Sequence, residues 1–505
     1  MNPLAASRAF APTMLLLLAM VACEAPDEPS PDTPTEDVEA EGSEDPGQDV
    51  GTAEPPEGDE GSLGPDEDAA PPASAERDEV DGDADDDGRD AGPHAEGGPE
   101  SQEADPEPIE PPSFARPDSI RGIYLTAWSA GSAARSEALL ELTDETELNT
   151  FVVDLKDATG YISHRTDVEM ALELGADGER RIGDLQGLLK RMEAAGVYPI
   201  ARIVVFKDHL LPETRPDLAL RLKDAGEGEF WRDNGGHPWT SPRSREVWDY
   251  HIELAREAAE LGFPEIQWDY VRFPDIPARV QETLHMPGDE EGTRAEVIRR
   301  FLDYSRSELA DLDVRVTADV FGVAATAPTD VGIGQRWEDF IDVVDVALPM
   351  IYPSHYWQGS FGFQEPNAHP YEVVWESLGQ AQSRSEGIEG AGEIIPWLQD
   401  FTMGSPRYEA PEVRAQIQAT YDRDIPHWIL WNPASRYTRE ALAPVDGFPE
   451  GHDPLVRIGG QVIPTSERME TLLAPEEAPE EAPVGSPDAT EDADDVSDRE
   501  LLRPF

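Results

Sequence analysis

Two aspartates, Asp269 and Asp319, end strand-like apolar segments and could act together on one bond. Side-chain alternation puts Gln267 and Asp269 on one face of their segment, and Thr317 and Asp319 on one face of theirs. Two carboxyl groups that face a glycosidic bond can cleave it, one as proton donor and the other as nucleophile or base. The pair therefore predicts chemistry on a sugar if the fold brings both aspartates to one cleft.

Short apolar segments recur after Arg121, and amphipathic segments lie between them. The strand-like segments are 122–128, 150–157, 198–206, 265–273, 314–321, 344–352, 394–401 and 428–432. The helix-like segments include 182–195, 244–261, 295–309, 337–341, 371–383 and 411–421. Gly196 and Gly262 follow two of these helices, where glycine commonly ends a helix. Strands and helices alternating in this way predict an α/β fold, a (β/α)8 TIM barrel.

A barrel of this kind has a definite place for polar residues. Alternate residues of each strand face the lumen, and active sites lie at the C-terminal strand ends. Asp154 and Lys156 share one face of the segment 150–157, opposite to Val153 and Leu155. Ionisable groups of one parity are therefore expected at the barrel mouth. The alternative is an open doubly wound sheet, which is disfavoured because no Gly-rich phosphate loop follows the first strand.

Several longer motifs point in the same direction. They are Glu246–Tyr250, Gly262–Pro274, Val153–Asp157, Ala318–Gly322 and Pro349–Tyr356. Together they resemble the glycoside hydrolase family of the DUF4015 domain, and the resemblance extends from Arg121 to Tyr437. It implies a glycosidase-like TIM barrel that acts on a polysaccharide or oligosaccharide.

The resemblance also suggests roles for the two aspartates. Similar glycosidase barrels carry a nucleophile at the position of Asp269, and Asp319 would be the general acid/base, with Asp154, Asp157 and Asp400 in reserve. Carboxyl groups about 5–5.5 Å apart would indicate a retaining mechanism, and about 6.5–9.5 Å an inverting one. An Asp269 fixed in a buried ion pair, or pointing toward the outer helices, would contradict its assignment.

Other side chains near the strand ends are predicted to bind the substrate. Cationic groups could hold the carboxylates ionised or bind sugar hydroxyls, or they could be structural ion-pair partners. Aromatic rings, Trp128, Trp239 and Tyr356 among them, could stack on sugars or simply fill the core. The predicted substrate-binding residues are Asp154, Lys156, Arg202, Arg272, Tyr352, His355, Trp397, Asp400 and Trp431. Neither a metal nor another cofactor is predicted, because no short His/Asp cluster is present.

The N-terminus has the features of an export signal. Arg8 precedes the apolar run Met14–Ala22, which is too short to span a bilayer. The run ends at Cys23 in a sequence that resembles the bacterial lipoprotein box. Residues 1–22 are therefore predicted to be a signal peptide and Cys23 to be lipidated, which would anchor the exported protein in the cell envelope, periplasmic or at the outer surface. An ordinary cleaved signal is the alternative. Because Cys23 is the only cysteine, an intrachain disulfide is excluded.

The rest of the chain consists of three segments that differ in amino-acid composition. Residues 23–115 are acidic, contain many Pro and Gly and lack aromatic residues up to Phe114, which predicts a disordered tether. The barrel is expected over 116–440, followed by a C-terminal extension, 441–505, that is acidic and disordered from about residue 470. The net charge of −67 argues against nucleic acid, which requires clustered Lys and Arg. A monomer is expected, because no coiled-coil pattern is present.

Other functions fit the sequence less well. No Gly-x-Ser-x-Gly or His-Glu-x-x-His motif supports a serine hydrolase or a zinc protease. The main alternative to an enzyme is a non-catalytic carbohydrate-binding barrel displayed at the cell surface, since fold does not imply activity. A single carboxyl group at the mouth would favour binding alone. The sugar, its linkage, endo or exo action and the leaflet of the anchor are open at this stage.

Overall fold

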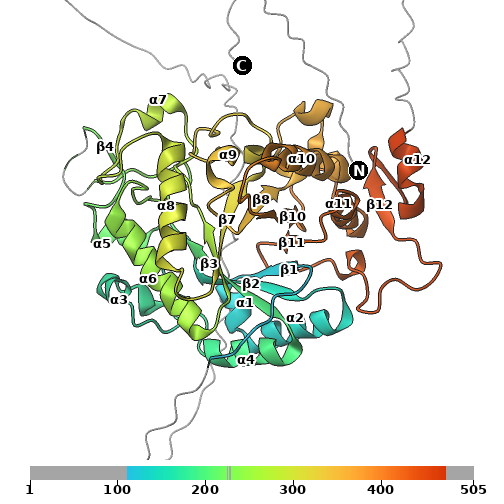
Figure 1. Ribbon diagram of the computed structural model, residues 1–505, viewed down its shortest axis with the longest axis horizontal. Coiled ribbons are helices and arrows are strands. Elements are labelled where there is room, and N and C mark those ends of the chain that lie inside the picture. Colours follow the sequence, from blue (N-terminus) through green and yellow to red (C-terminus); the bar gives the residue numbers. More distant parts are fainter. Residues whose placement is uncertain (1–110, 225, 227–228, 474–505) are drawn as a thin grey trace, which may run out of the picture. The chain divides into compact units, whose positions relative to one another are not determined.

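Parallel strands close into a barrel that is surrounded by helices (Figure 1). The computed structural model describes residues 111–224, 226 and 229–473. In order around the barrel, the strands are β1 (Arg121–Leu125), β2 (Thr150–Lys156), β3 (Tyr198–Val204), β5 (Glu265–Asp269), β7 (Arg315–Phe321), β8 (Val346–Ile351), β10 (Trp397–Gln399) and β11 (Trp428–Trp431). Parallel pairing of β11 with β1 and of β10 with β8 closes the ring. The predicted (β/α)8 TIM barrel is confirmed.

One position of the barrel is filled by two short pieces of chain. Strand β9 (Glu393–Ile394) pairs with the start of β8, and β10 pairs with the end of β8. Pro396 lies between the two pieces and has no N–H to donate to a neighbouring strand. The strand predicted as continuous over 394–401 is therefore interrupted.

The outer layer consists mainly of helices that follow the barrel strands. The longer ones are α2 (Ala133–Glu145), α4 (Leu185–Ala195), α6 (Arg245–Leu261), α8 (Arg294–Glu308), α10 (Pro370–Ser385) and α11 (Ala410–Asp422). The short ones are α1 (Ala127–Gly131), α3 (Glu169–Leu174), α5 (Leu210–Thr214), α7 (Ala278–Gln281), α9 (Trp337–Phe340) and α12 (Arg468–Leu473). Gly196 and Gly262 end α4 and α6 in the left-handed conformation, with φ of 69° and 112°, as predicted.

Side-chain alternation separates two apolar cores. Ile266 and Trp268 of β5 pack outward against the helices, in one cluster with Phe301 of α8. A second, smaller cluster fills the lumen and includes Val152, Ile200, Val346, Leu348 and Ile429. This alternation is what turns the polar residues of β2, β3, β5 and β7 into the lumen.

Two short segments extend the barrel. The antiparallel strands β12 (Leu455–Ile458) and β13 (Gln461–Pro464) form a hairpin next to α11, with Val456 and Ile458 in the outer core. Strands β4 (Arg221–Leu222) and β6 (Leu284–His285) pair in the loops after β3 and β5. The extension predicted after residue 440 thus contributes to the fold as far as residue 473.

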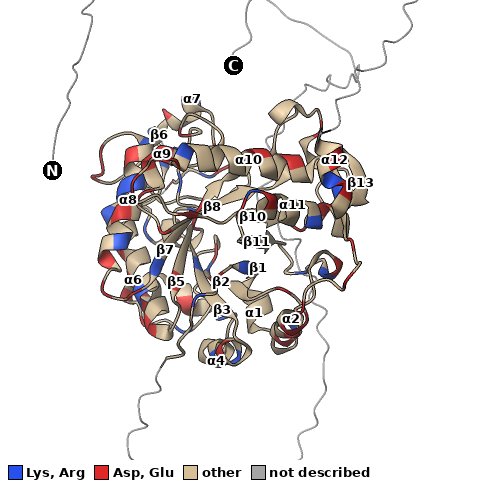
Figure 2. Cartoon of the chain, turned by 45° about the vertical axis from the view of Figure 1, so that its right-hand side comes forward, with Lys and Arg blue, Asp and Glu red and all other residues tan. Residues whose placement is uncertain are grey.

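The outer helices carry both signs of charge. Figure 2 shows acidic and basic residues side by side on α6 and α8. Arg256 of α6, for example, forms an ion pair at 2.8 Å with Asp311, which follows α8. Among the described residues, no helix is long and apolar enough to cross a membrane. The predicted signal peptide, Cys23, the tether up to residue 110 and the tail after residue 473 lie outside the described residues.

Candidate functional site

Arg202 of β3 lies at the centre of a buried polar cluster at the barrel mouth. Its Nη1 donates to Asp154 on β2 at 2.5 Å, and its Nε donates to Asp269 on β5 at 2.9 Å. Nε also lies 4.0 Å from Oδ2 of Asp319 on β7. Neighbouring strand ends therefore place three carboxyl groups around one guanidinium.

Asp319 is the most strongly perturbed of these acids. It accepts hydrogen bonds from Gln267 Nε2 at 2.9 and 3.0 Å and from Trp397 Nε1 at 2.6 Å. Burial raises its pKa well above the usual range, and the neighbouring Asp269 raises it further. The hydrogen bonds and Arg202 oppose this shift only in part. Asp319 is therefore a carboxyl group that keeps its proton where ordinary aspartates have lost theirs.

Asp269 is held from both sides. Its Oδ2 accepts from Nε and Nη2 of Arg202, and its Oδ1 accepts the backbone N–H of Tyr270 at 2.5 Å. Tyr270 has a φ of 50°, a left-handed conformation that non-glycine residues rarely adopt. Strain of this kind is concentrated at functional sites. Asp269 is thus fixed in a buried ion pair with Arg202, the arrangement named above as contrary to its assignment as nucleophile.

Asp154 lies on the other side of Arg202. It also accepts a hydrogen bond from the hydroxyl of Tyr124 on β1. Burial raises the pKa of Asp154 to about 6, although Arg202 lowers it. The strand ends of β2, β3, β5 and β7 thus form a charged part of the mouth, called here the carboxyl half.

Aromatic rings gather at the remaining strand ends, those of β8, β10, β11 and β1, called here the aromatic half. Trp431 stacks on Tyr124 with centroids 4.0 Å apart and meets Trp397 edge-on at 5.6 Å. Tyr352, just after β8, packs edge-on against Phe401 at 5.7 Å. Arg202 lies 5.3 Å from the Trp431 ring centroid, so the two halves are in contact.

A narrow pocket opens between the two halves. It is lined by Arg202, Asp269, Asp319, Met350, Tyr352, Trp397 and Trp431. The space is too narrow for a water molecule, so a bound sugar requires rearrangement of the lining side chains. Carboxyl groups facing aromatic rings across such a pocket are suited to sugar chemistry.

Comparison with known families agrees with this geometry. A family model described as "Putative glycosyl hydrolase domain" (DUF4015) matches residues 122–437, more than half of the chain. The chain belongs to this family. Membership assigns glycosidase activity to the barrel and confirms the resemblance seen in the sequence motifs. No curated protein matches the chain.

Solved structures similar to this glycosyl hydrolase domain include a hypothetical protein from Ruminiclostridium thermocellum, with 35% identity and a TM-score of 0.35 over 39% of this chain and 97% of that one. The PgaB (BpsB) glycoside hydrolase domain from Bordetella bronchiseptica has 13% identity and a TM-score of 0.43, over 63% and 95% of the two chains. A family 20 exo-β-N-acetylglucosaminidase from Vibrio harveyi has 14% identity and a TM-score of 0.40, over 64% and 51%. All three TM-scores are low, so the identification rests on the family match.

Five predicted binding residues do not line the pocket of the glycosyl hydrolase domain; one is Asp154, which bonds Arg202 beside the pocket. Lys156 follows an irregularity in the pairing of β2 with β3, and its Nζ bonds to Asp208 and to the backbone carbonyl of Val204, both at 2.8 Å. The parity rule that grouped it with Asp154 fails at this bulge. The other three residues are Arg272, His355 and Asp400.

Each of these three has partners of its own. Arg272 lies 4.6–5.0 Å from the ring centroids of Trp239, Tyr270 and Phe321. Asp400 accepts from the backbone N–H of Thr438 at 2.8 Å and from its hydroxyl at 2.6 Å, and burial raises its pKa to about 6.

His355 packs between Tyr352 and Phe401, and burial lowers its pKa to about 4. It is therefore uncharged at neutral pH.

Three residues of the site were not among the predicted site residues, although Gln267 was placed on the same face as Asp269. Tyr124 bonds Asp154, Gln267 bonds Asp319, and Met350 lines the pocket. The alternation of Tyr124 with the outward Ile123 and Leu125 was a usable signal. No comparable signal marks Met350, because an apolar strand residue that faces the lumen looks like one that faces the helices.

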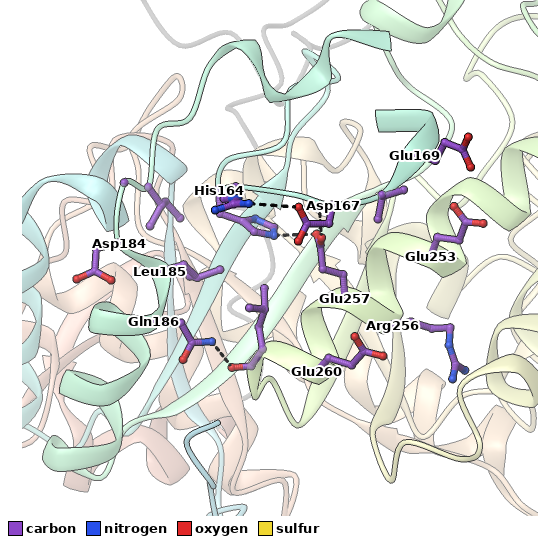
Figure 3. Close-up of a pocket in the computed structure, with 15 residues that line it drawn as sticks. His164, Asp167, Glu169, Asp184, Leu185, Gln186, Glu253, Arg256, Glu257 and Glu260 are labelled. Atoms are coloured by element: carbon purple, nitrogen blue, oxygen red, sulfur yellow. Dashed lines mark hydrogen bonds and ion pairs between the residues drawn. The ribbon is translucent and has the colours of Figure 1, made fainter. Parts of the chain in front are cut away.

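A larger groove of about 790 Å3 lies on the flank of the barrel (Figure 3), between the loop before α3, the start of α4 and α6. Figure 3 shows Glu257 turned toward the loop, where it accepts from Asp167 N at 2.7 Å and lies 3.1 Å from His164 Nε2. None of the predicted site residues lines this groove. Within residues 111–473, apart from 225, 227 and 228, no three His, Cys, Asp or Glu side chains are arranged to hold a metal ion.

Proposed function

We propose that the protein is an exported glycoside hydrolase that cleaves a cell-envelope or extracellular polysaccharide with Asp269 and Asp319, by the retaining mechanism. The observation that carries this proposal is the pairing of the two acids. Asp319 keeps its proton, Asp269 faces a guanidinium, and both line one pocket with Tyr352, Trp397 and Trp431. Acids held in different states by their surroundings can divide acid and nucleophile between them.

Asp319 is suited to be the general acid. Its raised pKa keeps the proton to higher pH than in an ordinary aspartate, and it lines the pocket in which the leaving oxygen of a glycoside would lie. After the proton is transferred, the carboxylate is stabilised by Gln267, Trp397 and Arg202. The same carboxylate then accepts a proton from the water that hydrolyses the intermediate.

Asp269 is proposed as the nucleophile despite its ion pair. A carboxylate has about four acceptor sites. Arg202 occupies two on Oδ2 and the Tyr270 N–H one on Oδ1, which leaves one site on Oδ1 for attack on the anomeric carbon. Arg202 Nε lies 2.9 Å from Asp269 Oδ2 and 4.0 Å from Asp319 Oδ2, so both carboxyl groups lie beside one nitrogen. Retention is proposed by analogy with glycosidase barrels that carry a nucleophile at the end of this strand.

The experiment compares sugar release by the wild type and by Asp269→Asn from glycol chitin, carboxymethyl cellulose and soluble starch. Wild type is expected to release reducing ends from one of them. The rate of release by Asp269→Asn is expected to be at least about 10³-fold lower. Exposed Asp303 of α8 provides the matched control, since Asp303→Asn changes no mouth residue. Equal rates of reducing-end release by wild type and Asp269→Asn would overturn the proposal.

Azide rescue identifies the nucleophile separately. Asp269→Ala with added sodium azide is expected to form a glycosyl azide of inverted configuration from an activated aryl glycoside, because azide takes the vacant place of the carboxylate. For the acid/base residue, azide is expected to rescue Asp319→Ala and to form a glycosyl azide of retained configuration. An exchange of these two outcomes would reverse the assigned roles.

A non-catalytic carbohydrate-binding barrel is the second candidate. It is favoured by the Asp269–Arg202 ion pair and by the narrowness of the pocket. The presence of three carboxyl groups at the mouth, rather than one, favours the enzyme. Wild-type protein that is retarded in a polysaccharide gel but releases no product would establish the binding role.

We also propose that the enzyme is a monomer attached to the envelope through a lipid on Cys23. The support is the sequence Met20–Cys23 after an apolar run. In a bacterial host, wild type is expected to incorporate labelled palmitate and to enter the detergent phase, whereas Cys23→Ser remains in the aqueous phase. Equal partitioning of the two would contradict the anchor.

A further inference from the structure

Two tryptophans of the barrel are exposed, in contrast to the others. Trp128 is 65% exposed and Trp357 is 67% exposed, while Trp239, Trp397 and Trp431 of the mouth are at most 8% exposed. An exposed indole gives up the favourable burial of a large apolar surface. Both rings follow the C-terminal ends of barrel strands, Trp128 in the short helix α1 after β1 and Trp357 in the loop after β8, and so lie on the side of the barrel where the pocket opens.

Trp128 is fixed from below. Arg181 lies 5.3 Å from its ring centroid, and the Arg181 side chain is only 4% exposed although it is charged. That guanidinium is held by Asp157, by Thr159 Oγ1 at 3.0 Å and by Glu179 at 3.1 Å. In addition, a Cβ at Gly131 would lie 1.8 Å from the Arg181 carbonyl oxygen, so α1 sits directly on this backbone. The ring is therefore supported on one side and open to solvent elsewhere.

Trp357 projects from a loop that is anchored around it. The preceding Tyr356 is buried and bonds Ser377 of α10 through its hydroxyl at 2.8 Å. The loop is closed by the N–H of Gly359, which donates to the carbonyl of Phe363 at 2.7 Å. Phe363 in turn stacks on His369 at 4.2 Å. An indole on such a loop is presented with little freedom to lose on binding.

The two rings lie at opposite ends of the aromatic half. In the order β8, β10, β11, β1, Trp357 follows the first strand and Trp128 the last. Trp397 and Trp431 belong to the two strands between them. An indole face binds the flat C–H face of a pyranose, and rings spaced along one rim suit a chain of such sugars better than a single sugar. The strongly acidic composition, with a net charge of −67, disfavours an anionic membrane as the partner.

We propose that Trp128 and Trp357 are binding platforms for sugar units on either side of the pocket, so that the substrate is a polysaccharide bound in its interior. This inference rests on the proposed glycosidase function. It adds that the chain runs along the aromatic half while the carboxyl half faces the bond to be cleaved. The enzyme would therefore act on internal bonds of a polymer of pyranoses.

The test uses Trp128→Ala, Trp357→Ala and the double variant in the full-length protein. The control is Val445→Ala, a residue that is 62% exposed and whose backbone N–H donates to the backbone carbonyl of Glu145, the last residue of α2. Retardation is measured in native gels containing glycol chitin, carboxymethyl cellulose or soluble starch. Hydrolysis of the retained polymer is compared with that of the p-nitrophenyl glycoside of the same sugar.

Each single variant is expected to weaken polymer retardation about 5–10-fold and the double variant more than either, with Val445→Ala equal to wild type. The ratio of kcat/KM on polymer to kcat/KM on the short glycoside should fall by a similar factor. Retention of the same ratio and the same retardation in the double variant overturns the inference while the glycosidase function stands. The inference is also overturned if none of the three polymers retards the wild-type protein.

A protein that hydrolyses nothing but needs both tryptophans for retardation would overturn the glycosidase function and keep the platforms. Binding of the wild type to anionic lipid vesicles, lost in the double variant without any change in polymer retardation, would assign the rings to a membrane and overturn the inference. Substitution by Phe is expected to restore most of the binding, because a ring face remains. Failure of Trp128→Phe to bind better than Trp128→Ala also counts against stacking.

Discussion

The carboxyl half and the aromatic half of the mouth are held together by different kinds of interaction. In the carboxyl half, charges are buried around Arg202 and each acid is held by directed bonds to fixed partners. In the aromatic half, rings such as Trp431 and Tyr124 meet through faces and edges without fixed hydrogen-bond geometry. Directed bonds suit bond cleavage, which requires atoms in set positions, and ring faces suit recognition of sugars that share a flat apolar side.

Asp319→Asn should give the largest effect, since it removes the proton that the carboxyl half supplies. Hydrolysis of a natural glycoside is expected to fall about 10³-fold, because the leaving oxygen then departs without protonation. A 2,4-dinitrophenyl glycoside, whose leaving group needs no proton, should lose far less in the glycosylation step. Steady-state and burst kinetics on both substrates check this. Equal losses on the two would show that Asp319 is not the general acid.

Arg202→Met tests how much the carboxyl half depends on its single cation. The substitution leaves Asp154 and Asp269 buried without their partner, so the free energy of unfolding at pH 7 is expected to fall by about 3–5 kcal/mol. Urea denaturation measures the loss. Arg165, which is 78% exposed and 3.7 Å from Asp167, is the control, and Arg165→Met should cost less than about 1 kcal/mol. Similar losses in both variants would contradict a central role for Arg202.

Asp154→Asn examines the cost of burying one acid of this half. Burial raises the folded-state pKa of Asp154 from 3.8 to about 6, so the folded protein binds this proton more tightly than the unfolded chain. The associated stability is fully present below pH 3.8 and is lost as the pH rises through 6. The loss amounts to about 3 kcal/mol.

In Asp154→Asn this part of the pH dependence should disappear, because the amide does not titrate. The check is the free energy of unfolding by urea at intervals between pH 4 and pH 8, with Asp303→Asn as the control. Parallel curves for wild type and Asp154→Asn would contradict the buried titration.

The fold was predictable because its signal is repeated along the chain. Eight apolar segments separated by helical ones leave few architectures, and alternation within β5 and β7 correctly turned Asp269 and Asp319 toward the lumen. The strand over 265–273 was predicted too long, since Phe273 is buried in the loop that follows β5 and looks like strand in the sequence. Helix α2 was missed because its buried face includes Ser136 and Thr143.

The site was predictable only where strand parity holds. The inward positions of Asp154 and Arg202 follow from alternation, and the structure brings both to the mouth. Lys156 departs from it at a bulge, which is set by the pairing with β3 and leaves no mark in the sequence. An ion pair of Asp269 was one of the alternatives left open, but its partner Arg202 could not be chosen, because two residues 67 positions apart meet only once the barrel has closed.

Trp397→Phe should have the smallest effect, and it acts where the two halves join. Trp397 belongs to the aromatic half, but its Nε1 donates to Asp319 at 2.6 Å and lowers the pKa of that carboxyl against the effect of burial. Without the donor, the pKa of Asp319 rises further and the acid stays protonated to higher pH. The alkaline limb of the kcat/KM profile is therefore expected to move up by about one pH unit.

Trp428→Phe is the matched control for Trp397→Phe. Trp428 is also buried and donates through Nε1, but to Tyr421 at 3.0 Å outside the lumen. Both variants lose comparable packing, so a difference between their pH profiles reports the hydrogen bond alone. An alkaline limb that moves equally in both, or not at all in Trp397→Phe, would mean that the aromatic half contributes ring faces to the site and leaves the proton of Asp319 to the carboxyl half.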